Sequence, residues 1–209
     1  MRKIAAMFVF VALLAGNASA EAGKITTSLM TGVAIPVSGN WASSKGTDAS
    51  GAGYDFGYKQ SFAGAIAADY QFQEMFAAGL ELGYNFNHKI KANQSDLEGG
   101  DEKILQITPY LKVTGKKMDK WTPYGILGLG LYSMKLTDEK DNSTGVTTAA
   151  SSVGYLGFNL GGGMMYDLSA NMQLGLDLRW HHIFSKSSSG ERSAVNNITP
   201  SLKLSYLFN

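Results

Sequence analysis

The chain has 209 residues, of which 44% are hydrophobic and only 17% are charged, with 25 glycines and no cysteine. Eighteen basic and 17 acidic side chains leave a net charge close to zero, which gives no overall positive charge with which to bind nucleic acid. The absence of cysteine excludes a disulfide framework and thiolate metal sites. A charged fraction well below the roughly 25% of soluble domains, together with abundant glycine, is unusual for a soluble enzyme.

The first twenty residues have the features of a secretory signal peptide. Arg2 and Lys3 give a basic start, an unbroken apolar run covers residues 4–15, and Ala-Ser-Ala at 18–20 forms an A-x-A cleavage site. The apolar run is too short for a spanning helix, which needs about 20 residues. We therefore expect a cleaved signal peptide over 1–20 and one domain over 21–209.

From Lys24 onward, apolar side chains alternate with small or polar ones, which is typical of strands with two different faces. Eight such runs follow one another, at 25–37, 58–72, 76–87, 105–113, 123–135, 155–168, 172–184 and 198–208. The apolar faces carry no Asp, Glu, Lys or Arg, and the opposite faces are rich in Gly, Ala and Ser. In the fifth run the apolar face is assigned to Leu127, Leu129 and Leu131.

This pattern decides which solvent surrounds the strands. Large apolar side chains exposed on every strand would aggregate in water, whereas in a bilayer they face lipid and barrel closure satisfies every strand edge. A soluble barrel of the lipocalin kind has the opposite packing, with an apolar interior and a polar exterior. The sequence therefore predicts an all-β, eight-stranded antiparallel transmembrane up-and-down β-barrel.

The connections alternate between short and long. Short turns are expected near 73–74, 115–120 and 169–171, and long polar loops at 38–56, 91–102, 137–152 and 185–194. In such barrels the short turns are periplasmic and the long loops extracellular, which puts both chain ends in the periplasm. Pro109 and Pro200 fall inside predicted strands, where we expect bulges or strand ends.

Aromatic side chains gather near the predicted strand ends, as expected of interfacial girdles. One band is predicted to contain Tyr70, Phe72, Phe76, Tyr166, Tyr206 and Phe208, near the periplasmic ends of the strands, and the other Tyr58, Phe86, Trp180 and Phe184, near the outer ends.

Three segments resemble a known family. They are Gly-Phe-Asn-Leu-Gly-Gly-Gly-Met-Met-Tyr-Asp-Leu-Ser at 157–169, followed by 174–180 with Asp177 and Arg179, and Trp-Thr-Pro-Tyr-Gly at 121–125. They are similar to the small outer-membrane β-barrel family, which groups opacity-type surface antigens with the transmembrane domain of outer membrane protein A. The ending at 202–208 resembles the signal read by the barrel-assembly machinery, although Asn209 follows the last aromatic residue. The resemblance implies a Gram-negative outer membrane, and periplasmic chaperones and the barrel-assembly machinery as partners during biogenesis.

Six charged residues fall on the inward faces of the predicted strands: Asp69, Glu81, Lys112, Asp177, Arg179 and Lys203. Three are negative and three positive, so they can form an ion-pair network. Because eight strands leave an interior that side chains can fill, we expect this network to close the lumen. We expect Arg179 to pair with Asp177, Glu81 or Asp69. The alternative is a gate in a narrow porin-like channel for small solutes or ions.

No catalytic, cofactor or metal site is expected. His181 and His182 are adjacent, so in a strand they point to opposite faces and cannot share a metal ion. A less favoured alternative is a lipid A-modifying enzyme that uses His182 with a serine, either Ser133 on a strand or a serine of the loop at 185–189. The serines have no recognisable dyad spacing, so we expect a protein that is not an enzyme.

The loops offer two kinds of contact. Trp41, Tyr54 and Phe56 are candidates for binding an unidentified surface ligand, and they fit the membrane girdle equally well. Outer-membrane lipids and lipopolysaccharide are the other expected partners, with Lys135, Lys140, Lys186 and Arg192 as candidate phosphate contacts that have acidic neighbours. The sequence thus favours a structural or surface-interaction protein that presents its loops outside the cell.

Overall fold

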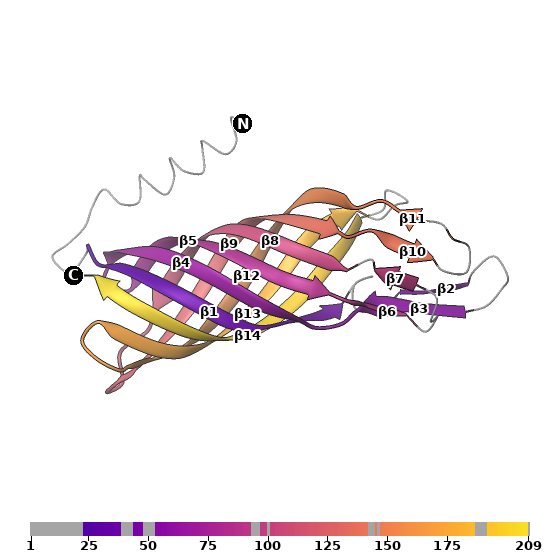
Figure 1. Cartoon of the computed structure of the whole chain (residues 1–209). Helices are drawn as coiled ribbons and strands as arrows, with labels where there is room; N and C mark the ends of the chain where they lie inside the picture. Colours follow the sequence, from indigo (N-terminus) through magenta and orange to yellow (C-terminus); the bar gives the residue numbers. More distant parts are fainter. Residues whose placement is uncertain are drawn as a thin grey trace, which may run out of the picture.

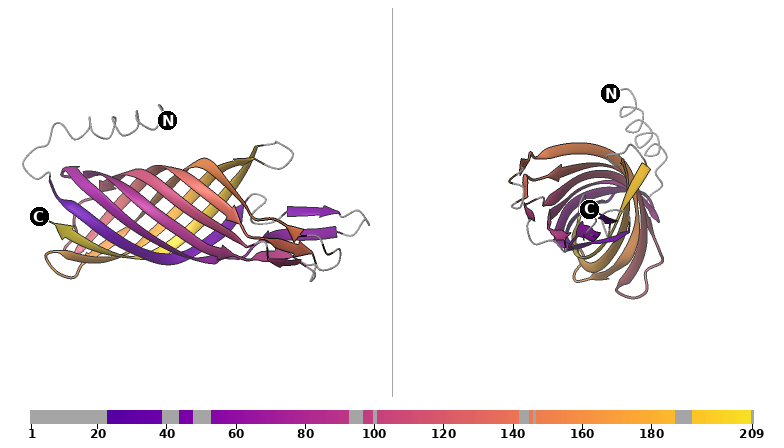
Figure 2. Two further views of the ribbon diagram at one scale, coloured as in Figure 1. Left: turned by 45° about the horizontal axis from the view of Figure 1, so that its top comes forward. Right: turned by 90° about the vertical axis from the view of Figure 1, so that its right-hand side faces the viewer.

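The structure is a computed structural model that describes residues 23–38, 44–47, 53–92, 97–99, 101–141, 145, 147–186 and 192–208. Eight long antiparallel strands form one closed barrel, in which each strand pairs with the next along the chain and the last pairs with the first. They are β1 (Ile25–Ser38), β4 (Ser61–Gln73), β5 (Phe76–His88), β8 (Glu102–Thr114), β9 (Trp121–Leu136), β12 (Ser151–Asp167), β13 (Met172–Lys186) and β14 (Arg192–Phe208). Figure 1 shows the barrel from the side, and the end view in Figure 2 shows the strands closing into a ring. The predicted eight-stranded barrel is confirmed.

The connections differ at the two ends of the barrel. The short turns at 74–75, 115–120 and 168–171 lie at one end of the barrel. The first residue of β1, Ile25, and the last residue of β14, Phe208, lie at the same end. The long connections extend from the other end (Figure 1). We call these the turn end and the loop end.

The loops contain short strands that the sequence analysis did not predict. β2 (Ser44–Thr47), β3 (Gly53–Tyr58) and β6 (Ile90–Ala92) form one three-stranded sheet, and β7 (Leu97–Gly99), β10 (Glu139–Asp141) and β11 (Thr147–Thr148) form another. Each sheet joins two different loops, through the ladders β3–β6 and β7–β10. Most of these segments have only two to four residues, too few to show alternation. β3 does alternate, with Tyr54, Phe56 and Tyr58 against Gly and Asp, but most of it falls in a segment that was expected to be a long polar loop.

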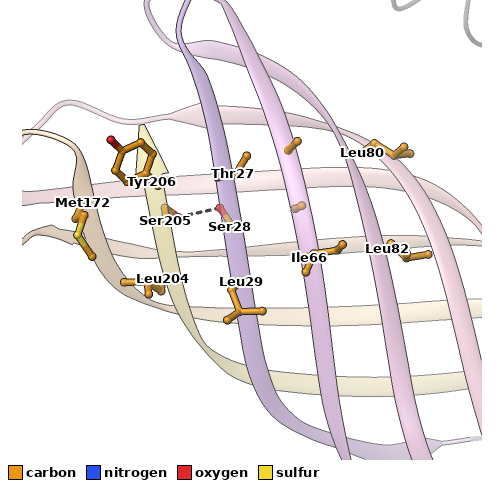
Figure 3. A pocket seen from close by; sticks show the side chains of 12 residues that line it. Thr27, Ser28, Leu29, Ile66, Leu80, Leu82, Met172, Leu204, Ser205 and Tyr206 are labelled. Carbon is orange, nitrogen blue, oxygen red and sulfur yellow. Dashed lines mark hydrogen bonds between the residues drawn. The ribbon is translucent and has the colours of Figure 1, made fainter. Parts of the chain in front are cut away.

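Over most of the barrel, large apolar side chains point outward, and small or polar side chains point inward together with two apolar clusters. Leu127, Leu129 and Leu131 are exposed at 54, 57 and 48%, which confirms the face assigned in the fifth run. Figure 3 shows the same on β1, β4, β5 and β14, where leucine and isoleucine side chains cover the outer wall. Behind that wall Ser28 and Ser205 form a buried hydrogen bond of 2.8 Å. A depression of about 640 Å³ over this wall is lined mainly by apolar side chains and belongs to the outer surface.

The expectation for the two prolines is wrong. Pro109 and Pro200 lie within strands, and the register is the same on both sides of each, so neither causes a bulge or ends a strand. Each proline interrupts the pairing with one neighbouring strand only, β9 for Pro109 and β1 for Pro200, where two consecutive pairs are missing. The reason is that proline has no backbone N–H to donate. The register shifts lie elsewhere, near strand ends, at residues 36–38, 71–73 and 85–88.

The interior is filled by side chains in layers. An apolar cluster toward the turn end contains Met30, Ala67, Tyr110, Tyr124, Ile126 and Met165, and one toward the loop end contains Ile104, Tyr132, Met134, Ile183 and Val195. The buried charged residues lie between and beside these clusters. Among the described residues, no helix has the length and apolar character needed to cross a membrane.

Candidate functional site: the charged lumen

Arg179 on β13 is the central residue of the lumen. Its Nη1 lies 3.2 Å from Oε2 of Glu81 on β5, and its Nε lies 2.7 Å from Oδ1 of Asp177 on its own strand. All three side chains are almost fully buried. In the strand order of the barrel, β5 and β13 are four strands apart, on opposite sides of an eight-stranded ring. The contact between Arg179 and Glu81 therefore crosses the full width of the lumen.

Neutral hydrogen-bond donors complete the shell of the two carboxylates. The Tyr124 hydroxyl donates to Oδ2 of Asp177 over 2.5 Å, and Nε2 of Gln106 donates to Oε1 of Glu81 over 3.1 Å. Each carboxylate thus has one oxygen facing Arg179 and the other facing a neutral donor. This arrangement offsets much of the cost of burying charge.

A second ion pair lies nearer the turn end. Nζ of Lys112 on β8 is 2.5 Å from Oδ1 of Asp69 on β4, and the Tyr110 hydroxyl donates to Oδ2 of the same carboxylate over 3.1 Å. Nζ of Lys203 on β14 lies 4.7 Å from the centre of the Tyr124 ring, a cation–π distance. Within the described part of the chain, Lys203 makes this ring contact and no ion pair.

Glycines on β12 make room for these side chains. A β-carbon at Gly161 would collide with the Arg179 side chain, and one at Gly163 would collide with the Tyr124 ring. Both glycines pair in register with the charged strand β13, Gly161 with Arg179 and Gly163 with Asp177. The glycine-rich run at 161–163 therefore permits a bulky ionic cluster inside a narrow barrel.

Little free space remains beside Arg179. A cavity of about 20 Å³ is lined by Glu81, Gln106, Arg179, His181 and other polar or small residues. That volume accommodates about one water molecule. The described side chains leave no wide aqueous path at this level.

All six charged residues predicted to face the lumen do face it. The sequence analysis did not assign partners, and it gave no role to Tyr110, Tyr124 or Gln106, which bind the carboxylates. Tyr110 could have been found from its place two residues before Lys112 on the same inward face. Tyr124 and Gln106 have no lumen charge within two residues or directly across from them, so only their inward positions gave a signal.

Nine of the ten predicted girdle aromatics occupy outward-facing positions, Phe86 among them with 46% exposure. Tyr58 is the exception, because it packs against the interior apolar cluster toward the loop end. Tyr70, Phe72, Phe76, Tyr166, Tyr206 and Phe208 lie toward the turn end, and Trp180 and Phe184 lie toward the loop end. The sequence analysis left out two members. Trp121 packs on Tyr166 with ring centres 4.8 Å apart, and Phe158 contacts Trp180 and Phe184 at 5.4 and 5.9 Å.

The two adjacent histidines lie on opposite faces, as predicted. His181 is buried in the lumen with Nδ1 3.2 Å from the Tyr132 hydroxyl, and His182 faces outward with Nδ1 2.8 Å from Oδ1 of Asn196. Among the described residues, no group of three His, Asp or Glu side chains could hold a metal ion.

A Ser–His contact that the sequence analysis missed lies near the loop end. The Ser61 hydroxyl is 2.9 Å from Nε2 of His88, and Nδ1 of His88 is 2.9 Å from the backbone oxygen of Lys59. Such a pair could activate a serine, but Ser61 is 6% exposed and His88 is fully buried. The contact therefore suits a structural role at the mouth of the barrel.

The outward faces are not free of charge at the loop end, which corrects the sequence analysis. Lys135 on β9 faces outward and is exposed, and it pairs in register with Lys103 on β8, also on the outward face. The expectation overlooked this because the predicted fourth run began at Leu105 and Lys135 ended the fifth.

Several residues predicted to make contacts in the loops lie, wholly or with their side chains, outside the described part of the structure. Trp41 lies outside the described residues, and Tyr54 and Phe56 belong to β3 with side chains outside the description. The side chains of Lys140, Lys186 and Arg192 are likewise outside it.

Comparison with protein families shows that residues 8–208 match the outer membrane protein beta-barrel domain. Comparison with curated proteins gave no significant match. Solved structures share the fold. Neisserial surface protein A aligns over 88% of this chain and 96% of its own, with 13% identity and a TM-score of 0.56. The outer membrane protein OprG of Pseudomonas aeruginosa aligns over 90 and 97%, with 17% identity and a TM-score of 0.62. The attachment invasion locus protein of Yersinia pestis aligns over 90 and 99%, with 15% identity and a TM-score of 0.50.

Proposed function

Because this chain belongs to the outer membrane protein beta-barrel domain family, and is thus a small β-barrel protein of the bacterial outer membrane, we propose that it is a non-enzymatic barrel with a closed lumen. In this proposal the barrel anchors a surface formed by its loops, and that surface makes the functional contacts. The lumen network is Asp69, Glu81, Lys112, Asp177, Arg179 and Lys203, and its role is to close and stabilise the barrel.

The observation that carries the proposal is the contact of Arg179 with Glu81 across the lumen. An ion pair between opposite strands blocks the interior where an aqueous channel would have to pass. The cavity beside it has room for about one water molecule. Barrels of eight strands have interiors that side chains can fill, whereas barrels with 16–18 strands leave a channel.

The loop sheets support the second half of the proposal. The ladder β3–β6 joins the first loop to the second, and β7–β10 joins the second to the third. Backbone pairing between loops holds them in a common arrangement (Figure 1). A pre-arranged surface loses less entropy on binding than three independent loops would lose. We propose that Trp41, Tyr54 and Phe56 contribute to this surface.

The orientation and processing follow from the same reasoning. We propose that residues 1–20 are removed during export and that the turn end, with both termini, faces the periplasm. Periplasmic chaperones and the barrel-assembly machinery would then act on the chain before insertion. Outer-membrane lipids and lipopolysaccharide surround the outer wall afterwards.

Conductance in planar lipid bilayers tests the closed lumen. The wild-type barrel should show no steady conductance at neutral pH and moderate voltage. A steady current with a defined ion selectivity would instead support the alternative, a narrow channel for small ions or solutes. A parallel measurement of lipid A mass in cells that express the protein should show no change.

A further inference from the structure

Two lysines face each other across strands β8 and β9 at the loop end. Lys103 and Lys135 are direct partners in the register of these strands, and both lie on the outward face. Direct partners have β-carbons about 5 Å apart, and like charges in such a pair destabilise a sheet. In the part of the chain that the structure describes, neither ammonium group forms an ion pair with a carboxylate.

Near this pair the outer wall changes from apolar to polar over one or two outward positions along each strand. Toward the middle of the barrel, the next outward residues are Leu105 on β8, Ser133 on β9 and Gly154 on β12. The outward positions after Ser133 and Gly154 are Leu131 and Leu156, and Leu105, Leu131 and Leu156 are 41, 48 and 66% exposed. Beside the pair, Ser152 is the register partner of Lys135, and its hydroxyl lies 3.4 Å from that of Ser133. The lysines thus stand at the edge of the lipid-facing apolar wall, where lipid headgroups lie.

We propose that Lys103 and Lys135 bind a phosphate group of a lipopolysaccharide molecule in the outer leaflet. This inference rests on the proposed orientation of the loop end toward the cell exterior. A phosphate has several acceptor oxygens and can receive hydrogen bonds from both ammonium groups, which converts a repulsive pair into a bridged one. The serine hydroxyls can donate to the same headgroup, and the leucines below can contact its acyl chains.

The geometry favours a lipid over a soluble anion. Both side chains start from the outer wall, and Lys103 is half-buried. A lysine at such a position can lay its carbon chain along the apolar wall and extend its ammonium group to the headgroup level. A ligand at this position must have an anionic group directly above an apolar part. Lipid A, with phosphates above acyl chains, has that structure.

The test measures lipopolysaccharide binding to the refolded barrel in phosphatidylcholine nanodiscs at low salt. Basic residues near an anionic membrane contribute about 1 kcal/mol each, so the double variant Lys103→Gln/Lys135→Gln should bind roughly thirtyfold more weakly. The double arginine variant should bind like wild type. A matched control, Lys24→Gln/Lys116→Gln, removes two exposed lysines from the turn end and should leave the affinity unchanged.

Two further comparisons identify the ligand group. Dephosphorylated lipopolysaccharide should bind wild type as weakly as the intact lipid binds the glutamine variant, and inorganic phosphate at equal concentration should not compete. Equal affinity of the glutamine variant and wild type for intact lipopolysaccharide would overturn the proposal, and so would full competition by inorganic phosphate. Labelling of Ala149→Cys from outside intact cells tests the orientation separately, so a failure there points to the proposed function and not to the lysine pair.

Discussion

The charges of the lumen and the charges of the outer rim have opposite surroundings. Inside, Arg179 contacts two carboxylates of the same chain, and both carboxylates have a further donor. Outside, Lys103 and Lys135 face each other with no carboxylate paired to them among the described residues. Because the lumen has little access to solvent, the protein itself supplies carboxylates to Arg179 and Lys112 and an aromatic ring to Lys203. The rim faces a membrane whose headgroups can supply the counter-charge. A charged side chain without a carboxylate partner on the outer wall therefore indicates that the surrounding membrane provides the partner.

The largest effect is expected from breaking the lumen network at its centre. Replacing Arg179 with Ala leaves Glu81 and Asp177 buried without their cation, which should lower the free energy of unfolding by about 3–5 kcal/mol. Urea unfolding in lipid vesicles, followed by tryptophan fluorescence, measures the loss.

A matched variant separates lost pairing from lost packing. The triple change Arg179→Met, Glu81→Gln and Asp177→Asn removes all three charges together, so no ion is left without a partner. It should be more stable than Arg179→Ala alone, because neutral side chains carry no comparable desolvation cost. A triple variant that is less stable than the single one would show that the unpaired carboxylates are not the source of the loss.

The next largest loss of stability is expected from placing a charge on the outer face of the barrel. Leu82 lies in the middle of β5 and is 43% exposed on the outward face. Replacing it with Arg should cost roughly 2–4 kcal/mol, the range for a lipid-facing arginine at the bilayer midplane. Ala65→Ser is the control, since Ala65 faces the polar cavity beside Arg179 and should accept a hydroxyl at little cost. A larger loss from the serine change would reverse the assignment of inside and outside.

The sequence was sufficient for the fold and for the face of each lumen charge, because strand alternation is a local pattern. It was not sufficient for the pairing of Arg179. Glu81 and Arg179 lie on opposite strands of the ring, and their contact depends on the tilt and register of every strand between them. Alternation says which side chains point inward but not which of them meet at one height.

Two other features were missed for related reasons. The short loop strands, such as β3 and β6, pair across different loops, and the sequence of one loop does not show which other loop it pairs with. The opposition of Lys103 and Lys135 likewise requires the register of β8 against β9. Each of these is a property of two segments together, so no pattern within either segment reveals it.

A smaller loss of stability is expected from replacing the two adjacent histidines. Because one faces the lumen and the other faces outward, they compare the two faces at neighbouring positions. Replacing His181 with Leu removes its buried contact with the Tyr132 hydroxyl and should cost about 1 kcal/mol. Replacing His182 with Leu should change stability by less than about 0.5 kcal/mol, because that side chain faces outward. Unfolding of both variants in the same vesicles gives the comparison, and equal losses would contradict it.

The smallest effect is expected at the turn end, where Lys117 and Asp167 form an ion pair over 2.5 Å with the lysine 59% exposed. Partial burial opposes ionisation of Asp167, but hydrogen bonds from Lys117 and Gln173 and the charge of Lys120 outweigh it and lower the pKa of Asp167. Folding therefore favours the ionised form. The resulting stability is complete above the unfolded pKa of about 4 and is lost as pH falls through the lower folded value.

Solvent screening limits this contribution to a few tenths of a kcal/mol, about what exposed ion pairs contribute. Unfolding of wild type and Asp167→Asn between pH 7 and pH 3 should show a small constant difference at neutral pH that disappears only in the acidic range. The same measurement at high salt should shrink the difference, because the pair is exposed. The loss from Arg179→Ala should hardly respond to salt, since its partners are buried. A salt dependence that is equally strong for both variants would mean that ions reach the lumen, and the contrast between a closed interior and an open rim would fail.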